Sequence, residues 1–242
     1  MYGWRGRLGL IVPSSNSTNE PEFYGTLPDG VSLHTARMKL ADVDAESLSA
    51  MADDVERCAE YLADADVDVV AYGCTTGSLV KGPGYDESLE ERIEAVTGSR
   101  AVATAASVKR AFEALDVSSV AITTPYVDDL NEREVEFLDA AGYQVTGIDG
   151  LGIGPNTGIG AQAPETAYER ARAIDTGDAD AVFVSCTNYR TFEAIAPLEA
   201  DLGKPVVTSN QATLWDALSA LGVDGGDAVA GLGRLFEHAV PR

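Results

Sequence analysis

Two stretches of the chain, Asp66–Gly77 (DVDVVAYGCTTG) and Asp178–Asn188 (DADAVFVSCTN), decide the fold because each repeats the pattern of the other. Each begins with Asp-x-Asp, continues through a short apolar run and ends in Cys-Thr. A short run that is apolar on both faces is typical of a buried strand in a parallel sheet. We therefore expect Cys74 and Cys186 at the carboxyl ends of two such strands, where the chain turns into a helix.

The repeat extends well beyond these stretches. The spacing of 112 positions that relates the cysteines also relates Pro13 to Pro125 and Gly30 to Gly142. After the cysteines the register slips by about eight residues, because the first half carries an extra loop at 81–88, and 101–104 then matches 205–208. Self-similarity of this kind indicates two homologous units. We predict two α/β domains of flavodoxin-like type, each with a four-stranded parallel sheet, related by a pseudo-two-fold axis, with the active site in the cleft between them.

Short β-rich runs alternate with amphipathic stretches along the whole chain, which favours parallel sheets with crossover helices. After the fourth strand of each unit we expect a helix, at 105–115 and at 210–221. We expect the last helix to return to the first unit, so that the first domain comprises 1–104 and 215–242 and the second comprises 105–214. The predicted strands are 7–12, 31–37, 67–72, 100–104, 118–124, 143–148, 180–185 and 205–208.

Composition excludes several classes of protein. Of the 242 residues, 39 are acidic and 17 are Lys or Arg, so the net charge is −22. An acidic surface of this kind fits a halophilic protein, whose self-repulsion is screened by salt, and it repels nucleic acid. No stretch approaches the ~18–20 uncharged apolar residues of a membrane span, and no apolar signal core precedes the first strand. We expect a cytoplasmic protein.

Cofactor and metal sites are also disfavoured. The three cysteines lack a CxxC pair, and His34 and His238 do not have a metal-ligand spacing. The Gly-rich run 150–160 superficially resembles a dinucleotide loop, but its spacing departs from GxGxxG and Pro155 removes a backbone donor. We interpret this run as a flexible cover loop that carries Asn156. The expected protein uses no cofactor and no metal.

The two repeated cysteines are the leading candidates for chemistry. Ligands of open α/β sheets bind outside the carboxyl ends of the strands. Helix N-termini at that edge stabilise anions and lower the pKa of a thiol below its usual ~8.5. Cysteines are often merely small buried hydrophobes, and Cys58, which lies in an apolar stripe of 3–4 spacing, has that character. Two cysteines at equivalent positions, each followed by Thr, instead predict a shared site.

Two further loops are expected at the rim of that site. Pro13-Ser-Ser-Asn16 follows the first strand, and Pro125-Tyr126 follows the fifth. Asn16 and Tyr126 are neutral donors that could hold carboxylate oxygens without adding charge. Ordinary turn chemistry accounts equally well for Pro, Ser and Asn in these loops.

These motifs together resemble the aspartate/glutamate racemase superfamily, and within it the branch of maleate cis–trans isomerases and arylmalonate decarboxylases. The resemblance covers essentially the entire chain. Arylmalonate decarboxylases usually have glycine in place of the first cysteine, and amino-acid racemases usually carry an Asp/Ser-Gly-rich first loop that is missing here. Maleate isomerases are the most similar. The motifs that carry the resemblance are Pro13–Asn16, Gly73–Gly77, Thr124–Tyr126 and Ser185–Asn188.

The resemblance implies Cys74 and Cys186 as catalytic residues, with Asn16, Tyr126 and Asn156 binding a small dicarboxylate. We add to the substrate-binding set the residues that follow the cysteines, namely Thr75, Thr76, Thr187 and Asn188. In the leading hypothesis, Cys74 adds to the double bond of a substrate such as maleate and Cys186 donates a proton. The family also implies a homo-oligomer.

Four alternatives stay open from the sequence. A racemase or epimerase of an amino or hydroxy acid would use two thiols on opposite faces of a carbon acid equally well. A related enzyme of solute degradation could act on a different acid, and an arylmalonate-type decarboxylase is less favoured. A binding protein that has lost turnover would have no need of reactive thiols.

Overall fold

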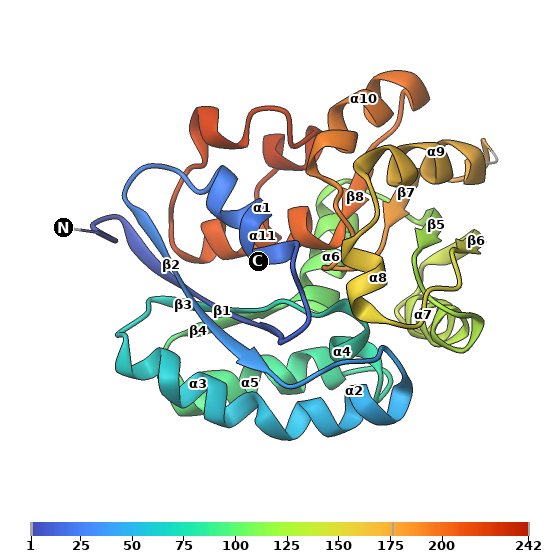
Figure 1. The fold of residues 1–242 in the computed structure, drawn as a ribbon. Helices are drawn as coiled ribbons and strands as arrows, with labels where there is room; N and C mark the ends of the chain where they lie inside the picture. Colours follow the sequence, from blue (N-terminus) through green and yellow to red (C-terminus); the bar gives the residue numbers. More distant parts are fainter. Residues whose placement is uncertain (1, 176, 242) are drawn as a thin grey trace.

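The computed structural model describes residues 2–175 and 177–241, and these residues form two four-stranded parallel sheets (Figure 1). The α/β class and the two-sheet architecture are therefore confirmed. The strand order of the first sheet, β2-β1-β3-β4, is repeated in the second as β6-β5-β7-β8. The strands are β1 (Gly6–Pro13), β2 (Val31–Met38), β3 (Val69–Tyr72), β4 (Arg100–Ala103), β5 (Ser119–Thr124), β6 (Gln144–Gly150), β7 (Ala181–Val184) and β8 (Val206–Thr208).

The pairing of individual residues follows the repeat found in the sequence. Leu8 pairs with Val69 in the first sheet, and Val120 pairs with Ala181, each 112 positions later, in the second. The later slip is seven residues rather than eight. Val70 pairs with Ala101 and its counterpart Val182 pairs with Val206, so 101–103 correspond to 206–208. The prediction that aligned 101 with 205 was one residue out, because the lengths of apolar runs do not determine hydrogen-bond register.

Helices cover each sheet in equivalent positions. In the first half, α3 (Val55–Asp64) and α5 (Tyr85–Thr97) pack on the sheet, and in the second half α9 (Pro164–Ile174) and α10 (Phe192–Leu202) do so. Both α5 and α10 end on a glycine with positive φ, Gly98 at +68° and Gly203 at +71°, which supplies the left-handed cap that stops a helix. The remaining helices are α1 (Asn19–Thr26), α2 (Ala45–Met51), α4 (Thr75–Leu79), α6 (Thr104–Ala114), α7 (Asp128–Ala140), α8 (Asn156–Gly160) and α11 (Ser209–Ala220).

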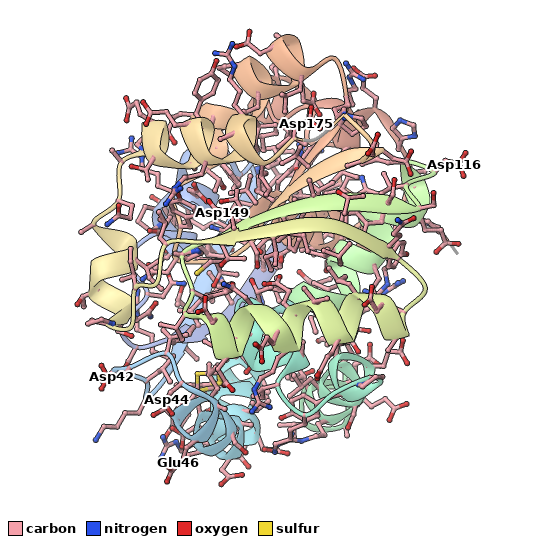
Figure 2. The ribbon with its side chains drawn as sticks, turned by 90° about the vertical axis from the view of Figure 1, so that its right-hand side faces the viewer. Asp42, Asp44, Glu46, Asp116, Asp149 and Asp175 are labelled. Carbon is pink, nitrogen blue, oxygen red and sulfur yellow. The ribbon has the colours of Figure 1, made fainter. Side chains whose placement is uncertain are left out.

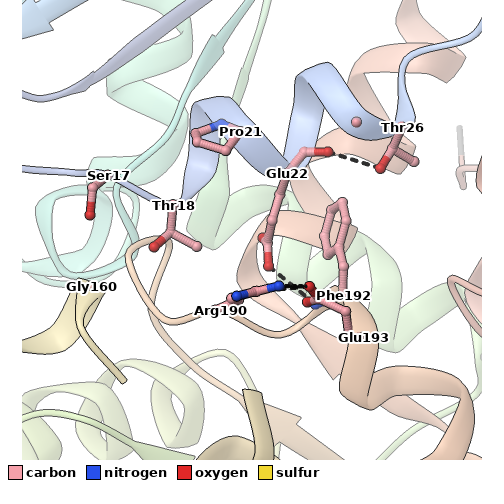
Figure 3. Close-up of a pocket in the computed structure, with 10 residues that line it drawn as sticks. Ser17, Thr18, Pro21, Glu22, Thr26, Gly160, Arg190, Phe192 and Glu193 are labelled. Carbon is pink, nitrogen blue, oxygen red and sulfur yellow. Dashed lines mark hydrogen bonds and ion pairs between the residues drawn. The ribbon is translucent and has the colours of Figure 1, made fainter. Parts of the chain in front are cut away.

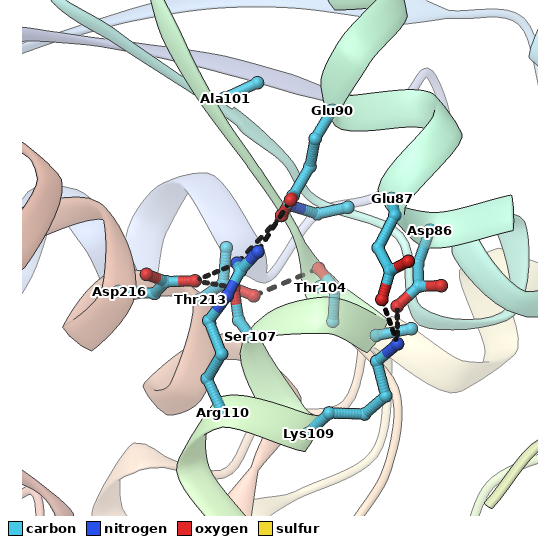
Figure 4. A network of polar contacts seen from close by, with 12 residues as sticks. Asp86, Glu87, Glu90, Ala101, Thr104, Ser107, Lys109, Arg110, Thr213 and Asp216 are labelled. Carbon is cyan, nitrogen blue, oxygen red and sulfur yellow. Dashed lines mark hydrogen bonds and ion pairs between the residues drawn. The ribbon is translucent and has the colours of Figure 1, made fainter. Parts of the chain in front are cut away.

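The helices that follow the fourth strand of each half lie where the halves meet. The helices α6 and α11 pack on each other, and each also touches strands of both sheets. Arg110 of α6 bridges Glu90 of α5 and Asp216 of α11, with a distance of 2.6 Å to each carboxylate (Figure 4). Because both helices contact both sheets, the proposed boundaries at 104 and 214 stay a prediction.

The repeated Asp-x-Asp pairs have a structural role at the edge far from the cysteines. The Asp68 carboxylate accepts the Arg7 N–H at 2.7 Å, and Asp180 accepts the Ser118 and Ser119 N–H groups at 3.0 and 2.8 Å. These backbone hydrogen bonds lower the pKa of Asp180 to about 2. In each half the aspartate thus ties the start of the cysteine-bearing strand to the start of its central neighbour.

Clusters of apolar side chains form the core, and most of the acidic side chains are at least partly exposed. Cys58 is 1% exposed within α3, as the stripe in the sequence predicted. Figure 2 shows Asp42, Asp44, Glu46 and Asp116 at the periphery, where all four are exposed. Among the described residues, no helix combines the length and the apolarity needed to cross a bilayer.

Candidate active site

One cavity between the two halves brings together every residue predicted for the site. The space within it, its open mouth included, is about 250 Å³. Its lining contains both cysteines, the four residues predicted from the sequence after them, and the three residues predicted from other loops. Three apolar residues that were not predicted, Pro13, Leu40 and Val43, complete the lining, which is otherwise formed by Asn16, Cys74, Thr75, Thr76, Tyr126, Asn156, Cys186, Thr187 and Asn188.

Cys74 caps a helix. It follows β3, has an extended backbone (φ −152°, ψ 113°), and precedes α4. Its Sγ accepts the Gly77 N–H at 3.3 Å and lies 4.0 Å from the Thr76 hydroxyl. The backbone N–H groups of Thr75 and Thr76 belong to the first turn and have no acceptor inside the helix. Cys74 therefore stands beside donors that can stabilise negative charge on sulfur or on a bound oxygen.

Cys186 has a different backbone. Its φ of +106° is a left-handed value that non-glycine residues rarely adopt. Its Sγ accepts the Asn188 N–H at 3.4 Å, and its own N–H donates to the Ser209 hydroxyl at 3.0 Å. The chain then turns directly, and the next helix, α10, begins only at Phe192.

Short side chains hold the two cysteine loops together. The Ser209 hydroxyl accepts hydrogen bonds from both the Cys186 N–H and the Thr75 hydroxyl. The Thr187 hydroxyl donates to the Gly73 carbonyl and accepts from the Asn16 amide, each at 3.1 Å. Each half thus contributes donors and acceptors to the loop of the other, and the cysteines are fixed relative to one another.

Burial dominates the acidity of both thiols in this closed arrangement. It raises the pKa of Cys74 to about 11, although the hydrogen bonds of Gly77 and Thr76 oppose it. It raises the pKa of Cys186 to about 12, opposed by hydrogen bonds from Tyr126 and Asn188 and reinforced by the nearby Cys74. The expectation of thiol pKa values below the usual range was wrong for this arrangement. Desolvation outweighs the helix terminus because the two sulfurs are only 5% and 6% exposed.

Several predicted binding residues already use their donors within the protein. The Asn188 amide donates both to the Asn156 carbonyl and to its side-chain oxygen, at 2.7 and 3.0 Å. One Asn156 amide hydrogen goes to the Ser15 hydroxyl, and one from Asn16 goes to Thr187. Asn16 and Asn156 each retain a second amide hydrogen, whereas the Asn188 amide donates to Asn156 twice and the Asn188 side-chain oxygen accepts the Ser17 N–H at 2.8 Å.

Two loops cover the cavity. Asp42 pairs with Pro155 in a short antiparallel bridge, and the Val43 N–H donates to the Gly154 carbonyl at 3.3 Å. The Gly-rich run 150–160 was predicted as a flexible loop, but both of its ends belong to regular elements. Gly150 is the last residue of β6, and Asn156–Gly160 forms the short helix α8. The bridge thus holds together the two loops that carry Val43 and Asn156, which line the cavity.

Cation and metal binding do not fit this site. All the side chains that line the cavity are uncharged. Throughout residues 2–175 and 177–241, no group of three or more His, Cys, Asp or Glu side chains could hold a metal ion.

Comparison with known proteins agrees with this geometry. The model of the arylmalonate decarboxylase family matches residues 8–236. The chain belongs to the arylmalonate decarboxylase family. Within the family it is similar to the maleate isomerase of Nocardia farcinica, with 34% identity over 242 residues and 96% coverage of each chain.

Two solved structures are especially similar. The maleate isomerase of Pseudomonas putida S16, solved with maleate, matches with a TM-score of 0.91 and 31% identity, covering 97% of this chain and 98% of that one. A cysteine-to-serine mutant of the Nocardia farcinica maleate cis–trans isomerase, with a covalently bound succinylcysteine intermediate, matches with a TM-score of 0.88 and 31% identity, covering 96% and 98%. These relatives confirm the maleate isomerase branch, and the protein is an isomerase.

Sequence reasoning missed four residues around the site. Ser209 carried a recoverable signal, because it follows the fourth strand of its half and aligns with Thr104 once the register is correct. Leu40 and Val43 follow β2 and are buried, at 4% and 5% exposure, although nothing in their pattern distinguishes them from core residues. Pro13 was aligned with Pro125 but was not assigned to the lining.

Proposed function

We propose that this protein is a cofactor-independent cis–trans isomerase of a small dicarboxylate such as maleate, with Cys74 as the nucleophile and Cys186 as the proton donor. The observation that carries the proposal is the presence of two cysteines from equivalent strand ends in one uncharged cavity. The relatives named above are maleate isomerases, and one of them carries a succinylcysteine.

Covalent addition explains why a thiol is needed. The Cys74 thiolate forms a carbon–sulfur bond with one alkene carbon, and the electron pair of the double bond moves to the neighbouring carbon and its carboxylate. Cys186 delivers its proton to that carbon, which leaves a succinyl thioether on Cys74. Rotation about the new carbon–carbon single bond is free. Return of the proton to the Cys186 sulfur and departure of the Cys74 thiolate then release the trans acid, so that atoms and charge balance.

The donors in the cavity suit two carboxylates. The N–H groups of Thr75 and Thr76 stand in the first turn of the helix that Cys74 caps. Asn16 and Asn156 line the same cavity, and each has one amide hydrogen besides the one bonded to Thr187 or Ser15. Negative charge that develops on a carboxylate during addition is stabilised by fixed donors in a site that excludes water. A neutral lining also leaves the thiols free of any competing ion pair.

The absence of charge disfavours an amino-acid racemase. An α-amino acid brings an ammonium group, and burial of an ammonium without a carboxylate partner is costly. No acidic side chain is among the described residues that line the cavity. An acid without an amino group fits the site better, and maleate is such an acid.

The decisive experiment follows maleate by NMR with the purified protein in concentrated salt. The wild type is expected to convert maleate to fumarate, and Cys74→Ala is expected to lose at least about a thousandfold in kcat because the covalent step is gone. Cys58→Ala is the matched control, since Cys58 is equally buried but lies in α3, away from the cavity. Undiminished turnover by Cys74→Ala would refute the mechanism, and solvent deuterium at Cα of an amino acid would favour the racemase.

A further inference from the structure

The left-handed backbone at Cys186 requires an explanation in its surroundings. A non-glycine residue with φ of +106° has a strained backbone, and this conformation persists only where neighbouring contacts hold it. Cys74, its counterpart in the repeat, has an ordinary extended backbone. The contacts that impose the difference must therefore act on the segment that contains Cys186.

A buried carboxyl lies directly behind Cys186. The hydroxyl of Ser185, the residue before it, donates to Glu134 Oε1 at 2.6 Å. Ser185 is 0% exposed and Glu134 is 1% exposed. The other carboxyl oxygen, Oε2, has no hydrogen-bond partner among the described residues. Burial raises the pKa of Glu134 to about 7. Retaining a half-satisfied carboxyl in the interior is costly, so stability alone does not explain it.

A second glutamate holds the far end of the same segment. The Glu22 carboxylate accepts the N–H groups of Thr191 and Phe192 at 2.7 and 3.1 Å. Its other oxygen accepts the Asn210 amide, which also donates to the Thr187 carbonyl. Figure 3 shows the Glu22 side chain reaching from α1 toward the segment at Phe192.

The two glutamates are related by the internal repeat. Glu22 and Glu134 are 112 positions apart and close the same pattern, Asn-Glu-x-Glu, at 19–22 and 131–134. Their hydrogen bonds nevertheless converge on one side of the site. Glu134 bonds to the start of the segment Ser185–Phe192, and Glu22 bonds to its end. Both glutamates of the repeat therefore bond to the segment that carries Cys186, although only one of them lies in the same half of the chain as Cys186.

We propose that Glu134 is a positioning residue that acts through Ser185 to hold Cys186 in its left-handed conformation, with the thiol directed into the cavity. The proposal rests on the proposed function in so far as Cys186 is the proton donor. Loss of the contact would let the backbone relax and move the sulfur away from the carbon that it protonates. Because substrate contacts are unchanged, kcat should fall while KM stays constant.

A double-mutant cycle tests the contact. Ser185→Ala and Glu134→Met should each lower kcat for maleate about tenfold to a hundredfold with KM within about twofold, and the double mutant should be no slower than the slower single mutant. Glu134→Gln keeps an acceptor for Ser185 and should recover most of the activity. Glu136→Gln, exposed on the same helix, is the matched control and should behave as the wild type.

A readout independent of turnover separates this proposal from the proposed function. Alkylation by iodoacetamide, measured for each cysteine by peptide mass spectrometry, gives the ratio of the Cys186 rate to the Cys74 rate. Both sulfurs lie beneath the same cover, so opening of the cover cancels in the ratio. We expect Ser185→Ala and Glu134→Met to shift that ratio at least about threefold, as displacement of one thiol requires.

Three results would overturn the proposal: an unchanged ratio in both single mutants, independent multiplication of their effects in the cycle, or Glu134→Gln being no more active than Glu134→Met. If Glu134→Met fails to fold, the ratio of the Cys186 to the Cys74 alkylation rate in Ser185→Ala still tests the proposal. Failure of the wild type to act on maleate would reject the proposed function, whereas the alkylation ratio would still decide the role of Glu134.

Discussion

The loops at Cys74 and Cys186 share the Cys-Thr motif and equivalent positions in the repeat, but their structures differ. Cys74 has an extended backbone and caps a helix, so that the Gly77 N–H points at its sulfur. Cys186 has a left-handed backbone, no helix begins immediately after it, and two buried groups, Cys74 and Glu134, raise its pKa further. A duplicated motif has thus produced two unequal thiols. The more acidic one suits a nucleophile and the less acidic one suits a proton donor.

The largest expected effect separates the two roles. Cys186→Ser should reduce turnover of maleate at least about a thousandfold but should leave Cys74 able to form the thioether. Intact-protein and peptide mass spectrometry should find one succinyl group, on Cys74. Cys74→Ser is the control and should remain unmodified. Modification of Cys186 in that control would reverse the roles.

The pH dependence of alkylation should sharpen the comparison. The thiolate is the reactive form, and burial raises the pKa values to about 11 for Cys74 and about 12 for Cys186. Both rates should therefore rise about tenfold between pH 8 and pH 9, with no plateau, and Cys74 should react faster than Cys186. In denaturant the two rates should become equal. A plateau below pH 9 in the folded protein would show that the resting thiols are not desolvated.

The smallest expected effect concerns backbone strain. Glycine adopts positive φ without strain, so Cys186→Gly should cost about 1–2 kcal/mol less in the free energy of unfolding than Cys74→Gly. Cys74→Gly additionally loses the sulfur that caps α4. Denaturant unfolding of both variants in the same salt measures the difference. Equal losses would mean that the left-handed conformation stores no strain.

The fold could be predicted well from the sequence because the two copies of the internal repeat had to be assigned the same strands and helices. The short apolar runs before Cys74 and Cys186 predicted buried strands, and equivalent strand ends then placed both cysteines at one cavity. The predicted alignment of the two halves after the cysteines was wrong by one residue. Aligned apolar positions tolerate such a shift, whereas the ladder that pairs Val182 with Val206, in which the Val182 N–H donates to the Pro205 carbonyl at 3.1 Å, does not.

The contacts that surround the site could not be predicted from patterns in the sequence. The carboxyl of Glu134 is separated from Ser185 by 51 positions, and Glu22 is separated from Thr191 by 169. Contacts at such separations depend on how the halves pack. The thiol pKa values were misjudged for the same reason. A helix N-terminus can be recognised locally, but the cover formed by the loops at Asp42 and Pro155, which removes water from both sulfurs, cannot.

The neutral lining of the cavity has a consequence for how an acid reaches it. The chain carries a net charge of −22, so an anion approaching from bulk solution is repelled before it meets any hydrogen-bond donor. Dissolved salt shortens the range of that repulsion from about 30 Å at 0.01 M to about 3 Å at 1 M. Added salt should therefore shorten the distance over which the acidic surface repels an anion that approaches the cavity.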